Sequence, residues 1–139
     1  MVYEQLTGAK LRERVTNVEV SQADVCFVAA INGHKVSNSF DATVAASRDM
    51  GRVLRIQTVE QTLAVEPQKL MIACKTVHAA PIGALFGRSN SVEGEIDFSP
   101  KSQGRYVVTG TLSNSGSAVW IEDAATAEIV SAKVSTGKP

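Results

Sequence analysis

The sequence predicts an all-β fold: an antiparallel β-sandwich of about seven to nine strands, with one short helix near residues 41–50 as a possible addition. Segments that alternate apolar and polar residues recur along the chain, and a period of two is typical of strands with one buried face. Short stretches rich in turn-forming residues separate these segments, and such short connections join antiparallel neighbours. With 139 residues, 44% of them hydrophobic, residues 1–139 suit a single globular domain.

The N-terminal part supplies the first strands. Residues 1–10 carry no regular pattern and are expected to form a loose N-terminal extension. Residues 11–20 mix charged and β-branched side chains, which predicts an edge strand. Residues 23–31 are apolar on both faces, as in a central strand that is covered on both sides.

The middle of the chain begins with a turn. Asn32-Gly33 is the strongest short hairpin signal in the sequence, and it predicts a return strand over residues 34–40. Residues 41–51 are rich in alanine and end in glycine, which favours a short helix with Asp41 as its N-cap. A long connection between two sheets is the alternative for this segment. Two further strands are expected over residues 52–65 and 69–77.

The C-terminal stretch, residues 93–134, predicts a four-stranded meander. Its turns are polar and contain proline or glycine, which suit the backbone angles of tight turns. The expected strands cover residues 94–98, 105–112, 118–122 and 128–134.

This stretch resembles the C-terminal half of small bacterial cell-envelope lipoproteins of β-sandwich type, over about a third of the chain. The matching residues form a G-x-Y strand and a W-I-E-D-x-x-T-x-x-x-V hairpin: Gly104, Tyr106, Trp120, Ile121, Glu122, Asp123, Thr126 and Val130. Such proteins often have glycine just after the threonine, where this chain has Ala127-Glu128. The resemblance implies a periplasmic or outer-membrane-anchored protein and no shared catalytic residues.

The N-terminal residues and the net charge restrict which compartment and which partners are expected. The first eight residues lack the apolar core of a signal peptide, so the resemblance implies that a processed, lipid-anchored segment precedes this sequence. A cytoplasmic protein is the alternative. The net charge is zero, with 14 basic and 14 acidic residues, which argues against nucleic acid and a polybasic membrane surface. No apolar run is long enough for a membrane-spanning helix.

The two cysteines, Cys26 and Cys74, each lie in an apolar strand-like segment. A disulfide between them, joining the two sheets, is one hypothesis, and by the chain-entropy model it would contribute up to roughly 4 kcal/mol. Two buried free thiols are the alternative, because cysteine is among the most buried residue types.

The segment 78–90 is long and apolar for a loop, and long loops in compact domains are often functional. We expect it to contact a partner through an apolar centre with a polar rim. The alternative is a cap that buries its apolar side chains over one end of the sandwich. The expected contact residues are His78, Ile82, Leu85, Phe86, Arg88 and Asn90.

Catalytic, cofactor and metal motifs are absent from the sequence pattern. His34 and His78 are the two histidines, and no serine- or cysteine-hydrolase signature surrounds them. Together with Cys26 and Cys74 they are spaced too widely for a typical zinc site. The sequence therefore predicts no catalytic residue, no metal and no cofactor. Acidic residues in the meander are expected on a solvated sheet face, and Trp120 is expected in the core, with stacking on a sugar or base as the alternative.

These observations favour a non-enzymatic cell-envelope accessory or binding protein that contacts another envelope protein, of inhibitor, immunity or assembly-adaptor type. One alternative is a β-barrel with an internal pocket that binds or hydrolyses a small ligand. The other is a structural subunit of a surface assembly. The sequence leaves the oligomeric state open.

Overall fold

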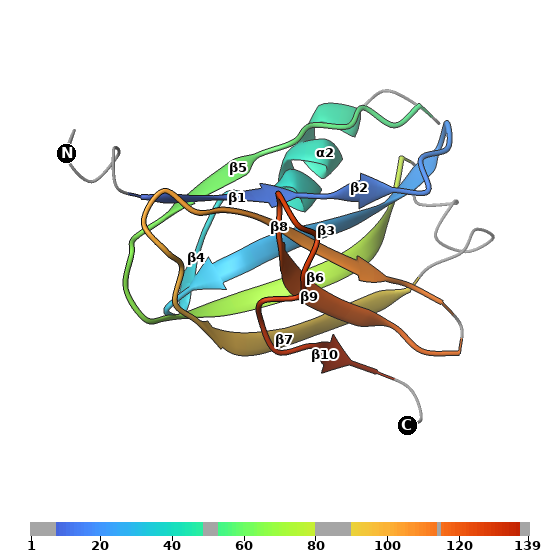
Figure 1. Cartoon of the computed structure of the whole chain (residues 1–139). Coiled ribbons are helices and arrows are strands. Elements are labelled where there is room, and N and C mark those ends of the chain that lie inside the picture. Colours follow the sequence, from blue (N-terminus) through green and yellow to red (C-terminus); the bar gives the residue numbers. More distant parts are fainter. Residues whose placement is uncertain (1–7, 49–52, 80–89, 114, 137–139) are drawn as a thin grey trace.

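The computed structural model describes residues 8–48, 53–79, 90–113 and 115–136. The described part is mostly β, with one short helix (Figure 1), so the predicted all-β sandwich-like fold is confirmed. Three of the strands, β2, β4 and β10, are only two residues long. The elements are β1 (Ala9–Glu13), β2 (Val15–Thr16), β3 (Gln22–Ile31), β4 (His34–Lys35), α2 (Ser39–Ser47), β5 (Glu60–Leu63), β6 (Gln68–His78), β7 (Ser91–Phe98), β8 (Arg105–Thr111), β9 (Ala118–Asp123) and β10 (Val134–Ser135).

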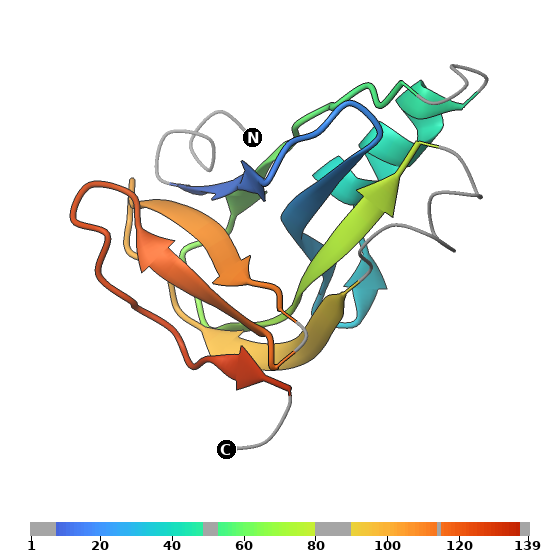
Figure 2. The ribbon, with the colours of Figure 1, turned by 90° about the vertical axis from the view of Figure 1, so that its right-hand side faces the viewer.

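The strands form two sheets that pack face to face (Figure 2). Sheet A has the order β10-β9-β8-β1-β5, and sheet B has the order β2-β3-β6-β7, with β4 paired to β3. Apolar side chains from both inner faces make the main core, because burial removes them from water. Its fully buried members include Leu11, Val28, Ile72, Val108 and Ile121.

The first strand differs from its prediction in two ways. The expected edge strand over residues 11–20 is instead split, and β1 lies between β8 and β5 inside sheet A. Its pairing with β8 is parallel, whereas the sequence predicted antiparallel pairs throughout. The chain passes from sheet A to sheet B at Arg14, whose N–H donates to the Val108 carbonyl and whose own carbonyl accepts from Cys26.

Strand β3 lies inside sheet B and is buried on both faces over most of its length, which confirms the central strand predicted for residues 23–31. The Asn32-Gly33 turn is also confirmed, with φ angles of 51° and 80°. Such positive angles suit asparagine and glycine at the centre of a two-residue hairpin. The return strand is shorter than expected, since β4 ends at Lys35.

Helix α2 begins at Ser39, and its N-cap is Asn38 rather than the predicted Asp41. The Asn38 side-chain oxygen accepts from the Asp41 backbone N–H at 2.8 Å, so it satisfies a donor that has no partner within the helix. Asp41 lies in the first turn, where its negative charge faces the positive end of the helix dipole. The buried positions of the helix are polar: Ser39, Thr43 and Ser47.

These three hydroxyl groups bind the extended segment 53–59, most of which the sequence had assigned to a strand. The N–H groups of Val59, Gln57 and Arg55 donate to Ser39, Thr43 and Ser47 at 2.8, 2.9 and 2.8 Å. The spacing explains the fit: four helical residues rise about 6 Å and two extended residues about 6.6 Å. Only residues 60–63 of the expected strand pair with a sheet, as β5.

Helix α2 and segment 53–59 together cover the outer face of sheet B (Figure 2). Phe40 of the helix stacks on Phe27 of β3 at 5.2 Å between ring centroids, while Leu54 and Ile56 pack on the same cluster. None of the described helices or strands lies over the outer face of sheet A, and in the described part of the chain we call that face open. No helix within the described ranges is long and apolar enough to cross a membrane.

The C-terminal strands show why glycine stands at position 110 and where the predicted strands end. A side chain at Gly110 would overlap the Ala118 carbonyl oxygen and approach the Cys74 sulfur at 2.8 Å. The predicted last strand, 128–134, is mostly irregular: Ile129 forms an isolated bridge with Glu122, and β10 begins only at Val134. Ala127, where the resembling proteins often have glycine, takes a φ of 62°, a left-handed angle that favours glycine.

Candidate functional site

The open face of sheet A carries a row of cations on β1. Ala9 and Leu11 point into the core, so the alternate residues Lys10 and Arg12 point outward. Arg14 continues the same row beyond the strand, and its guanidinium donates to the Thr109 hydroxyl at 3.3 Å. Three cations therefore follow one another on one side of the strand.

Strand β8 extends this positive surface sideways. In the parallel register Lys10 lies opposite Arg105, and Arg12 lies opposite Val107. Arg105 is exposed, whereas Val107 is buried and forms an apolar floor beside Arg12. We call the surface formed by Lys10, Arg12, Arg14 and Arg105 the cationic face.

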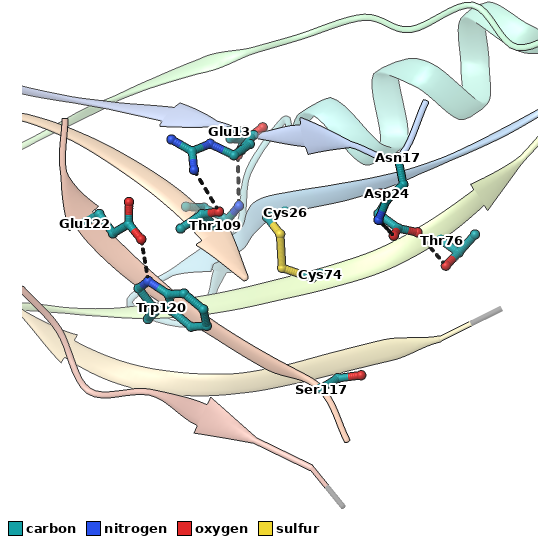
Figure 3. Close-up of a disulfide and its surroundings, with 12 residues drawn as sticks. Glu13, Asn17, Asp24, Cys26, Cys74, Thr76, Thr109, Ser117, Trp120 and Glu122 are labelled. Carbon is teal, nitrogen blue, oxygen red and sulfur yellow. Dashed lines mark hydrogen bonds between the residues drawn. A yellow bond between two sulfur atoms is a disulfide. The ribbon is translucent and has the colours of Figure 1, made fainter. Parts of the chain in front are cut away.

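Two carboxylates border the cationic face. Glu60 on β5 lies opposite Arg12, and Glu122 on β9 lies opposite Val107 on the other side. Glu122 accepts a hydrogen bond from the Trp120 indole N–H at 2.9 Å (Figure 3). The Trp120 ring is also covered by the Lys133 ammonium, 4.7 Å from its centroid, which is typical of a cation–π contact. Trp120 thus lies half-buried on the outer face of sheet A, whereas the sequence had placed it in the core.

A surface pocket of about 250 Å³ lies beside Arg12 and Arg14, at one end of the cationic face. Its lining comes from β1, β8 and the turn after β9: Arg12, Glu13, Arg14, Val107 and Ala124. Guanidinium groups at the rim of a pocket suit planar anions such as carboxylates, because the guanidinium fork can donate two parallel hydrogen bonds.

Within the described residues, the cations of the cationic face form no ion pair, although Glu60 and Glu122 lie at its border. The ion pairs between described residues, Lys69–Asp97 at 3.0 Å and Lys75–Glu93 at 3.4 Å, both lie on sheet B. No described carboxylate forms an ion pair with Lys10, Arg12, Arg14 or Arg105. The positive charge of this face is therefore available to a partner.

A buried carboxylate fixes β1 beneath the cationic face. Glu13 accepts from the backbone N–H groups of Val28 and Ser39 at 2.8 and 2.7 Å, and from the Gln61 side chain at 3.2 Å. A shift in register beside Val28 interrupts the regular β3–β6 pairing at this point. Burial raises the pKa of Glu13, although these hydrogen bonds act in the opposite direction. Glu13 joins β1 to sheet B and to the start of α2, which holds the row of cations in place.

The predicted contact loop is only partly described. Ile82, Leu85, Phe86 and Arg88 lie outside the described residues, so their expected role stays a prediction. His78 and Asn90 are both half-buried at the same end of sheet B, where β6 ends and β7 begins. The two ring nitrogens of His78 and the amide nitrogen of Asn90 are shielded from solvent and have no hydrogen-bond partner.

This end of the sandwich is lined by polar side chains. Asp24 is buried and accepts from the Thr76 hydroxyl and the Asn17 amide, both at 2.8 Å (Figure 3). Gln22, also buried, lies opposite His78 in the β3–β6 pair. Unpartnered buried polar atoms are uncommon in folded proteins, and these nitrogens lack a partner among the described residues.

The two cysteines lie directly opposite each other on β3 and β6, and the structure joins them as a disulfide (Figure 3). The bridge links neighbouring strands of sheet B, so the expectation that it would join the two sheets was wrong. Its sulfur atoms lie in the core beside Gly110 of sheet A.

The other candidate residues do not assemble into a reactive site. His34 is exposed on β4, at the opposite end of β3 from the strand pair that holds His78. Within the described ranges no group of three or more histidine, cysteine or acidic side chains is arranged to hold a metal ion. The acidic residues of β7, Glu93, Glu95 and Asp97, are exposed, as the sequence predicted.

The sequence carried a signal for the cationic face that the prediction passed over. The run K-L-R-E-R over residues 10–14 places a cation at every second position, which on a strand means one face. Comparisons with protein-family models, with curated proteins and with solved structures found no match to this chain.

Proposed function

We propose that this chain is a non-enzymatic binding protein that recognises an acidic surface of another protein through the cationic face. The observation that carries the proposal is the clustering of four cations, none of them in an ion pair with a described residue, on the outer face of sheet A in a chain whose net charge is zero. An acidic partner would be attracted to this patch, because clustered like charges raise the local potential.

Clustering these cations has a cost in the free protein. Neighbouring outward side chains on a strand pair are about 5–7 Å apart, where two like charges in water repel by roughly 0.7 kcal/mol. A partner that supplies carboxylates converts this repulsion into attraction. The cationic face is therefore better suited to intermolecular contact than to stabilising the fold.

The surroundings favour a protein partner over a nucleic acid or a glycan. The Trp120 indole N–H is bonded to Glu122 and its ring is covered by Lys133, so the ring is not free to stack on a base or a sugar. Glu60 and Glu122 would also repel a phosphate backbone that extended across the sheet. A protein partner with a smaller set of carboxylates, placed over β1 and β8, would keep those carboxylates away from both Glu60 and Glu122.

The proposed compartment is the cell envelope, periplasmic or anchored at the outer membrane. The Cys26–Cys74 bridge supports this proposal, because disulfides persist in oxidising compartments and are rare in the cytosol. Inhibitor, immunity and assembly-adaptor proteins all fit a binding role of this kind.

A titration with poly-L-glutamate, followed by calorimetry at low ionic strength, tests the proposed function. The wild-type protein should bind, and the double variant Arg12→Glu with Arg105→Glu should bind about tenfold or more weakly, because two attractive charges become repulsive. The double variant Lys35→Glu with Arg55→Glu is the matched control, since it changes the net charge equally but lies on the side of sheet B. Equal weakening by the control, or no binding by the wild type, would contradict the proposal.

A further inference from the structure

We infer that the acidic partner presents an extended segment with a carboxylate at every second residue, lying along β1. This inference rests on the proposed function, because it uses the same cationic face. It adds the conformation and the spacing of the ligand, which net charge alone does not specify.

The spacing comes from the strand geometry. Lys10 and Arg12 are two residues apart on β1, so their outward side chains are separated by about 6.6 Å, and Arg14 continues the row. An extended peptide also repeats its side chains on one face every two residues, with the same rise. Each carboxylate of an alternating acidic segment can therefore meet one cation, without loss of register along the row.

The width of the cationic face favours an extended ligand over a helical one. Glu60 lies on the strand next to β1, about 5 Å from the row of cations. A helix with its side chains is about 10–12 Å across and would overlap Glu60 when centred on β1. An extended segment is about as wide as one strand spacing, so it can lie over β1 while leaving Glu60 uncovered.

The contacts would be made by side chains rather than by backbone pairing. Strand β1 already has β8 and β5 as hydrogen-bonded neighbours, so it has no free edge to which a new strand could add. Binding should therefore be strongly salt-dependent, because exposed ion pairs are screened within about 10 Å at 0.1 M salt.

Lys10 and Arg105 give the face a direction. They lie opposite each other across the parallel pair, so one end of the row holds two cations side by side. Each end has a hydrogen bond to a threonine: the Lys10 ammonium donates to the Thr62 hydroxyl at 2.8 Å, and the Arg14 guanidinium donates to the Thr109 hydroxyl at 3.3 Å. The end of the peptide with the higher negative charge is expected to lie over Lys10 and Arg105.

Fluorescence polarisation with three labelled peptides of equal composition tests the inference. Each peptide contains the same numbers of glutamate, threonine and alanine residues over about nine positions. In the first, glutamate stands at every second position; in the second, the glutamates form one block; in the third, they are paired four residues apart, the spacing of one helix face. The alternating peptide should bind at least about fivefold more tightly than either of the others, a difference of roughly 1 kcal/mol. Arg12→Glu should remove this preference, whereas Lys35→Glu should keep it.

The outcomes separate the two proposals. Equal affinities for the three peptides would overturn the extended, alternating ligand and leave an unpatterned acidic partner as the proposed function. Tighter binding of the helical or the block peptide would overturn it as well and would identify the preferred form. If neither the peptides nor poly-L-glutamate bind, the proposed function itself is contradicted.

Discussion

The hydroxyl contacts between α2 and segment 53–59 give the sharpest prediction about the fold. Thr43 is fully buried, and its hydroxyl accepts from the Gln57 N–H at 2.9 Å and donates to the Gln57 carbonyl at 3.2 Å. Thr43→Val keeps the volume and shape of the side chain but removes both hydrogen bonds. A buried backbone group that loses its partner costs about 1–3 kcal/mol, and the exposure of Gln57 lets water replace part of this loss.

We therefore expect Thr43→Val to lower the free energy of unfolding by about 1–3 kcal/mol. Thr43→Ser keeps the hydroxyl and loses a methyl group, so its loss should be smaller, at about 1 kcal/mol. Urea unfolding of both variants, followed by circular dichroism, gives the comparison. A valine variant as stable as the wild type, or more stable than the serine variant, would refute the reasoning.

Three more predictions concern the backbone, the core and the pH dependence. Ala127→Gly should raise the free energy of unfolding by up to about 1 kcal/mol, because it relieves a left-handed alanine at a φ of 62°. Urea unfolding measures this change, and a lower stability of the variant would contradict the prediction. Gly110→Ala should destabilise by about 2 kcal/mol or more, since the new methyl group overlaps the Ala118 carbonyl and crowds the Cys74 sulfur; an unchanged melting temperature would show that this contact is wrong. Because burial raises the pKa of Glu13, the folded protein holds this proton more tightly than the unfolded chain does. The contribution of Glu13 to the free energy of unfolding therefore falls as the pH rises from about 4.5, the ordinary pKa of a glutamate, through the raised pKa of the folded state. A Glu13→Gln variant whose stability depends on pH in the same way as the wild type would contradict this prediction.

The features that sequence predicted well depend on local chemistry. Asn32-Gly33 forms its turn because those two residues tolerate positive φ angles, and the central strand is recognisable because it is apolar on both faces. The start of α2 also had a local signal, since Asn38 precedes the helix and accepts from Asp41. That signal was assigned to the wrong residue because aspartate and asparagine are both good N-caps.

The features that sequence missed depend on contacts between distant residues. Segment 53–59 has the alternation of a strand, but its backbone is bound by hydroxyl groups of α2 instead of by a neighbouring strand. The parallel pairing of Lys10 with Arg105 joins residues far apart in the chain, and no local pattern encodes it. The alternation of cations on β1 was visible, yet whether that face is open follows only from the arrangement of the layers.

Nuclear magnetic resonance tests the central claim most directly. Amide shifts of the ¹⁵N-labelled protein would be followed during titration with the alternating acidic peptide at low salt. The account predicts that the perturbed residues are on the cationic face and its floor, Lys10, Arg12, Arg105 and Val107, and that the shifts disappear at high salt. Perturbations confined to sheet B or to the end that holds His78 and Asn90 would contradict it, as would a spectrum that does not change.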